Sequence, residues 1–200
     1  MLVSLATFVL AAVLVVLLPG PDTLVVVRNL LRGGRKLAAR TVLGVLTGLT
    51  VWAVTAVLGL SAVLRASHDA YIGLRLVGAA YLVYLGVSSL LARTKQHQSS
   101  RPLLGKGYTA GLLSDLLNPK VGVFFVTFLP GFVPHGYPVG WTSLLFGGIF
   151  IALTASYFAL MLVCSGPVTR WMTNAQLRRR LDRCTGLVLI GFGMRLALDP

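Results

Sequence analysis

The sequence predicts an all-α membrane protein with six transmembrane helices arranged as a 3+3 inverted repeat, in which helices one and four are broken at prolines. The chain of 200 residues is 56% hydrophobic and only 12% charged, whereas soluble domains carry roughly 25% charged residues. Six apolar segments, each near the length that crosses a bilayer, cover about residues 2–27, 38–64, 71–92, 107–132, 141–165 and 184–198. The first segment of each half contains an interior proline.

The first segment carries no charge until Asp22, and it is interrupted just before that residue by Pro19, Gly20 and Pro21. Proline lacks a backbone donor and clashes with the preceding helical turn. Irregular backbone at membrane depth is tolerated only where protein or a water-filled cavity satisfies it. An ionisable residue in such a place indicates a functional site by default. We therefore interpret this break as half of a transport site.

Small residues at a spacing of four follow in the second and fourth segments. Gly44 and Gly48 lie in the second segment, and Gly107 and Gly111 lie in the fourth. This spacing lets helices approach closely in lipid, so we expect these glycines at helix–helix contacts. The contacts could form within one chain or between chains, so the sequence is compatible with a homo-oligomer.

The fourth segment is interrupted at Asn118 and Pro119, and Lys120 follows directly. If the segment starts near Tyr108, Lys120 lies about 18 Å along it at 1.5 Å per residue. This depth is near the middle of a hydrocarbon core of roughly 30 Å. Asp115 lies one turn earlier. A lone charge is costly at this depth, so we expect Asp22 and Lys120 to approach each other or to share a wet cavity.

The net charge of +13 comes almost entirely from Lys and Arg in the links between segments. The links at 28–40, 93–106 and 170–183 are the basic ones, whereas the link between segments four and five has no Lys or Arg. Basic loops stay in the cytoplasm, so we expect these three links on the cytoplasmic side. With six spans, both termini then lie on the outer side of the membrane. A nucleic-acid partner is not expected, because it would need a basic face on a folded domain.

The chain divides into two halves, with a three-helix repeat at 1–92, a cytoplasmic linker at 93–106 and a second repeat at 107–200. A shift of 100 residues places Pro19 on Pro119. Because each half has three spans, the halves must lie in opposite orientations. Interrupted segments at matching positions of two such halves indicate a transporter whose substrate site lies near the bilayer midplane.

At these motifs the chain resembles the LysE/RhtB family of amino-acid exporters. The matching stretches are Pro19-Gly20-Pro21-Asp22-Thr23, Val27-Arg28-Asn29, Arg32-Gly33-Gly34-Arg35, Gly44-Val45-Leu46-Thr47-Gly48, Tyr81-Leu82-Val83-Tyr84-Leu85-Gly86, Leu117-Asn118-Pro119-Lys120 and Phe128-Leu129-Pro130-Gly131-Phe132. The resemblance covers nearly the whole chain. It implies a multi-pass exporter of small amino acids or their derivatives in the cytoplasmic membrane, which needs no cofactor because the proton gradient drives it.

The resemblance also places the family's signature loops on Pro19 to Asp22 and on Asn118 to Lys120. At the position of Asp115, the resemblance implies an uncharged polar residue at least as often as an aspartate. We therefore keep two roles open for Asp115, a second proton site or a partner for Lys120. For Asp22 and Lys120 two interpretations also stay open. They form either an ion pair that only pins the broken helices, or a site that binds a zwitterion or exchanges a proton.

Two other classes of function fit the sequence less well. A cation or metal-ion transporter would need several carboxylate, Cys or His ligands, but the three histidines lie in links and only Asp22 and Asp115 lie in the predicted core. We therefore expect no metal site. A membrane-embedded enzyme would need a nucleophile with a base or a metal motif, and no histidine lies in the apolar segments to act as that base.

Overall fold

The computed structural model describes residues 2–17, 19–66, 68–91, 105–134, 136–164 and 175–198. All regular elements in these ranges are helical. They are α1 (Leu2–Leu17), α2 (Pro21–Ala66), α3 (His68–Leu91), α4 (Tyr108–Leu116), α5 (Pro119–Val123), the π-helical turn η2 (Phe124–Phe128), the 3₁₀ turn η3 (Leu129–Phe132), α6 (Val139–Val163) and α8 (Ala175–Leu198). Most of the predicted linker at 93–106 lies outside the described residues.

The helices have the composition of a membrane protein. Two described stretches, Pro21–Gly59 and Val139–Val163, are long and apolar enough to cross a bilayer, and a third is added if Tyr108–Leu116 and Pro119–Phe132, bent by 54°, form one span. Large apolar side chains are exposed on these helices and on α3, among them Leu43, Leu58, Val77, Leu160 and Val163. Exposed apolar surface on this scale marks a face that meets lipid or another protein.

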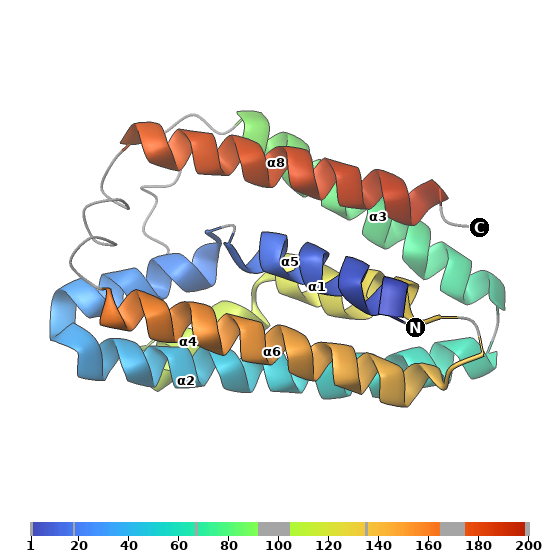
Figure 1. Cartoon of the computed structure of the whole chain (residues 1–200), viewed down its shortest axis with the longest axis horizontal. Helices are drawn as coiled ribbons and strands as arrows, with labels where there is room; N and C mark the ends of the chain where they lie inside the picture. Colours follow the sequence, from blue (N-terminus) through green and yellow to red (C-terminus); the bar gives the residue numbers. More distant parts are fainter. Residues whose placement is uncertain are drawn as a thin grey trace.

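The first basic link is helical almost throughout, which corrects the prediction of a loop at 28–40. Helix α2 contains a sharp turn at Gly33 and Gly34, and its two arms fold back on each other there (Figure 1). Gly34 has φ +67°, a left-handed conformation that glycine adopts without steric strain. Across the turn, Asn29 Nδ2 donates to Thr41 Oγ1 at 2.8 Å, and both side chains are buried. This bond joins the two arms.

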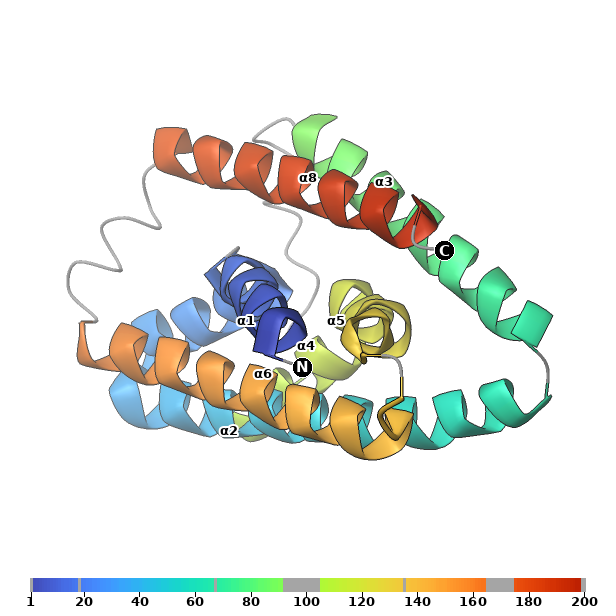
Figure 2. The ribbon, with the colours of Figure 1, turned by 45° about the vertical axis from the view of Figure 1, so that its right-hand side comes forward.

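Helices α3 and α8 form a separate layer beside the rest of the molecule (Figure 2). Their backbones nearly touch, because a Cβ atom at Gly86 would lie 2.6 Å from the Gly186 carbonyl oxygen and one at Gly186 would lie 2.7 Å from the Gly86 carbonyl oxygen. Helix α8 begins at Ala175. The arginines at 178–180 and 183 therefore belong to a helix, not to the loop in which the sequence analysis placed them, and Arg170 lies outside the described residues.

The second arm of α2 packs along α4 through glycines. A Cβ atom at Gly44 would collide with the Tyr108 carbonyl oxygen, and one at Gly111 would collide with the Thr41 carbonyl oxygen. Gly107, with φ +56°, is the residue before the first turn of α4. Close backbone approach of this kind holds helices together by van der Waals contact where no hydrophobic effect acts between them.

Stacked aromatic rings fill the space between α1, η2 and α6. The Phe8 and Phe146 rings stack with their centroids 4.6 Å apart, and the Phe124 and Phe150 rings lie 4.5 Å apart. All four side chains are buried. Aromatic pairs add about 0.5–1.5 kcal/mol beyond the area they bury, so this cluster fixes α1 and η2 against α6 next to the helix breaks.

Candidate functional site

Two interrupted helices meet in the centre of the molecule. Helix α1 ends at Leu17 and α2 starts at Pro21, while α4 ends at Leu116 and α5 starts at Pro119. Proline is favoured at the first position of a helix because it has no donor to leave unpaired and its φ is preset. Pro21 and Pro119 thus each occupy the first position of a helix, whereas Pro19, which the shift of 100 residues had aligned with Pro119, lies before the start of α2.

This register puts two opposite charges at equivalent positions. Asp22 is the second residue of α2, and Lys120 is the second residue of α5. Each therefore follows a helix-starting proline at the break in its half of the chain. The free N–H groups at a helix start favour a nearby negative charge, and both starts face the same region.

The Asp22 carboxylate is held by two side chains from the other half of the chain. Ser114 Oγ donates to Asp22 Oδ1 at 2.7 Å, and Asn118 Nδ2 donates to Asp22 Oδ2 at 2.7 Å. Asn118 has a fixed orientation, because its Oδ1 accepts from the Lys120 backbone N–H at 3.1 Å. Hydrogen bonds to a charged acceptor are roughly twice as strong as neutral ones, so both donors stabilise the ionised form of Asp22.

The Lys120 ammonium reaches back to the end of α1. Its Nζ donates to the Val15 carbonyl oxygen at 3.1 Å, which is one of the last carbonyls of α1 and has no partner in a continuing helix. The Lys120 charge also interacts with that of Asp22. Lys120 thus joins α5 to the end of α1 and brings a positive charge into the cavity that Asp22 also lines.

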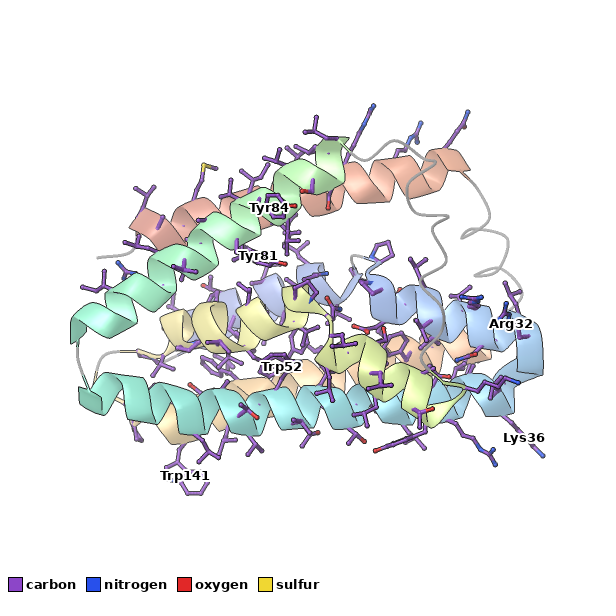
Figure 3. All side chains as sticks on the ribbon, turned by 180° about the vertical axis from the view of Figure 1, so that it is seen from behind. Arg32, Lys36, Trp52, Tyr81, Tyr84 and Trp141 are labelled. Carbon is purple, nitrogen blue, oxygen red and sulfur yellow. The ribbon has the colours of Figure 1, made fainter. Side chains whose placement is uncertain are left out.

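Asp115 is wholly buried, with 0% of its surface exposed. Neither of its carboxylate oxygens has a hydrogen-bond partner among the described residues. Its backbone carbonyl accepts from Trp52 Nε1 at 3.3 Å. Trp52 belongs to α2, and its side chain points from α2 toward α5 (Figure 3). Gly48 leaves room for the carboxylate, since a Cβ atom there would lie 2.5 Å from Oδ2.

These groups line one cavity of about 50 Å³. Its polar wall includes Asp22, Asp115, Asn118 and Lys120, together with Gly20. Its apolar wall is formed by aliphatic and aromatic side chains, which are Val15, Val16, Val45, Leu49, Val121, Phe124, Phe150 and Phe158. A cavity needs roughly 10–15 Å³ to hold one water molecule. This cavity therefore has room for a few waters and must widen to take a larger molecule.

The structure thus brings together the four polar residues that the sequence analysis singled out. Four further polar residues at this place were not predicted from the sequence, namely Thr23, Ser114, Thr154 and Tyr157. Tyr157 on α6 and Thr23 at the start of α2 line the same cavity. Ser114 could have been found, because it lies one helical turn before Asn118, but nothing in the fifth segment distinguishes Thr154 or Tyr157 from other residues.

The described part of the cavity holds few of the side chains that bind metal ions. In the described ranges no three His, Cys, Asp or Glu side chains gather closely enough to hold a metal ion. The acidic groups of the cavity are Asp22 and Asp115, and Asp22 is already occupied by two donors and the Lys120 charge. Divalent ions such as Ca²⁺ take six to eight oxygen ligands, which this cavity does not offer.

Comparison with known proteins identifies relatives along the whole chain. The family model described as LysE type translocator matches residues 13–200. An uncharacterised membrane protein of Bacillus subtilis, YrhP, is 31% identical over 98% of this chain and 99% of its own length. The leucine efflux protein of Salmonella typhimurium is 28% identical over 96% of this chain and 93% of its own length. No solved structure matches the chain significantly.

Proposed function

Because the chain belongs to the family of LysE type translocators, we propose that it exports amino acids with apolar side chains across the cytoplasmic membrane in exchange for protons. As a member of that family it is a multi-pass membrane transporter and not an enzyme. The substrate class, the coupling ion and the particular membrane are proposals that go beyond membership of the family. The leucine efflux relatives support the class of substrate.

The observation that carries this proposal is one cavity that holds a cation, Lys120, together with two carboxylates, Asp22 and Asp115. A free amino acid has an ammonium and a carboxylate on one carbon, so its recognition requires both charges in one small space. Lys120 suits the carboxylate, as do the N–H groups at the start of α2. The apolar wall, with Leu49, Phe124 and Phe158, suits a side chain such as that of leucine.

The helix packing supports a 3+3 inverted repeat. Gly86 meets Gly186 and Ile190, and Gly186 in turn meets Gly86 and Leu90. This reciprocal pattern is what a two-fold axis between α3 and α8 produces when Gly86 of one helix corresponds to Gly186 of the other. We infer two repeats at 1–92 and 107–200, with helices one and four as the broken spans and the halves rocking about the cavity.

The distribution of charge supports the orientation. Arg32 and Lys36 lie at the end of the molecule where α2 turns back, and Trp141 points outward near the opposite end (Figure 3). The first and the last described residues also lie on the side of the molecule where Trp141 is found (Figures 1 and 3). Basic residues favour the cytoplasm and tryptophan favours the membrane interface, so we place both termini outside. A reporter active only outside the membrane should work at the C-terminus and stay silent at Gln98.

The experiment that tests the function is efflux from proteoliposomes. A panel of labelled amino acids is loaded, and their release is followed with and without an imposed proton gradient. Gradient-dependent release of leucine or a similar amino acid, and no release of a divalent cation in the same vesicles, supports the proposal. If folded protein moves no amino acid, or moves a metal ion instead, the proposed substrate class is wrong.

A further inference from the structure

The two buried carboxylates of the cavity are in opposite chemical situations. Each oxygen of Asp22 accepts a hydrogen bond at 2.7 Å, and the Lys120 charge lies beside it. Neither oxygen of Asp115 accepts a hydrogen bond from a described residue, although its side chain is the more deeply buried of the two. The two donors and the Lys120 charge therefore stabilise the ionised form of Asp22, whereas the described residues give the Asp115 carboxylate no such stabilisation.

The other titratable groups around Asp115 do not balance its charge. Asp22 on α2, Lys120 on α5 and Tyr157 on α6 line the same cavity. The charges of Asp22 and Lys120 compensate each other, and Tyr157 is a phenol, which is uncharged at neutral pH. An ionised Asp115 would leave one unbalanced negative charge in a buried place, which is strongly unfavourable. Asp115 therefore requires either a proton or a cation.

We propose that Asp115 is the shared site at which the coupling proton and the ammonium group of the exported amino acid exclude each other. The inference rests on the proposed function and adds the residue that couples the two fluxes. The same carboxylate forms an O–H bond with a proton or an ion pair with the ammonium, but not both. Such competition produces exchange in opposite directions without a second ion site.

The cycle balances in atoms and charge. On the cytoplasmic side the Asp115 carboxylic acid releases its proton to water, and the substrate ammonium takes its place beside the carboxylate. On the outer side the amino acid leaves, and a proton from the outer water re-forms the O–H bond. One proton enters for each zwitterion that leaves, so one positive charge moves inward in each cycle.

Proton release on binding tests this inference directly. Leucine is titrated into the purified protein by calorimetry in buffers of different ionisation enthalpy, which counts the protons released per bound leucine. We expect the wild-type protein to release close to one proton at neutral pH and to bind leucine more weakly as the pH falls. Asp115→Asn should bind leucine without proton release and with a pH-independent affinity. Ser156→Ala, an exposed residue on α6, should behave as wild type.

Several outcomes separate the inference from the proposed function. If the wild-type protein binds no amino acid of the panel, the proposed function fails. If it binds leucine but Asp115→Asn releases as many protons as wild type, Asp115 is not the shared site. A second measurement needs no variant, because dicyclohexylcarbodiimide modifies protonated carboxyl groups in apolar surroundings. We expect the adduct on Asp115, reduced by added leucine and by raised pH, and an adduct on Asp22 instead would overturn the assignment.

Discussion

Asp22 and Asn118, 96 residues apart in the chain, are joined by a hydrogen bond of 2.7 Å across the junction of two interrupted helices. The bond can form in one way only. The Asn118 Oδ1 atom already accepts from the Lys120 N–H, so its Nδ2 atom must point at Asp22. A helix cap in one half of the chain thereby positions the charged residue of the other half. This relationship makes several variants informative.

Asp22→Asn isolates the charge of this residue from its shape. The new amide can accept from Asn118 and donate to the Ser114 hydroxyl, so both contacts persist. The Lys120 charge then loses its counter-charge, and breaking a buried pair costs about 3–5 kcal/mol. We expect a clearly lower thermal midpoint in detergent and loss of gradient-driven leucine efflux.

The double variant Asp22→Asn with Lys120→Met separates a structural pair from a functional one. Removing both charges should restore most of the lost stability, because no unpaired buried charge is left. Efflux should remain absent, because the substrate carboxylate has lost its cation. If the double variant transports at the wild-type rate, the two charges only pin the broken helices and the proposed site is wrong.

Ser114→Ala removes one of the two donors to Asp22. A hydrogen bond to a charged group contributes about 1.5–3 kcal/mol, so we expect efflux to slow by roughly 10-fold or more. Ser156→Ala is the matched control, because that hydroxyl donates to the Ala152 carbonyl of its own helix and is exposed. Equal efflux rates for the two variants would show that the Ser114 contact does not matter for transport.

Gly44→Ala tests the contact between α2 and α4. The added methyl group would collide with the Tyr108 carbonyl oxygen, and overpacking of this kind typically costs about 1–3 kcal/mol. The thermal midpoint should fall, and efflux should fall with it because Ser114 and Asp115 on α4 would shift. Gly148→Ala on α6 has open space around the new Cβ atom and should leave both measurements unchanged or raise stability slightly.

Thr41→Val tests the bond that joins the two arms of α2. Valine has nearly the same shape, but it leaves the buried Asn29 amide without the acceptor it uses at 2.8 Å. An unsatisfied buried polar group costs about 1–3 kcal/mol. Thr50→Val removes an exposed hydroxyl that bonds only within its own helix and should change the free energy of unfolding by much less. Equal losses in both variants would contradict a joining role for Asn29 and Thr41.

Much of the framework follows from local chemistry that the sequence displays. Apolar composition decides that the chain enters a membrane, because lipid and not water must surround such helices. Proline at 21 and at 119 decides where two helices restart, because proline fits the first turn and no later one. The convergence of Asp22 and Lys120 in one cavity was anticipated because lone charges are costly in lipid.

The tertiary structure decided what depends on contacts between distant segments. Only the structure shows that Pro21, like Pro119, begins a helix, and that Ser114 and Asn118 bind Asp22. It also shows that the basic link at 28–40 is two helical arms around Gly33 and Gly34. The difference between Asp22 and Asp115 also belongs to this level. Both are single aspartates beside a proline break in the sequence, and only their neighbours in space give one two donors and the other none.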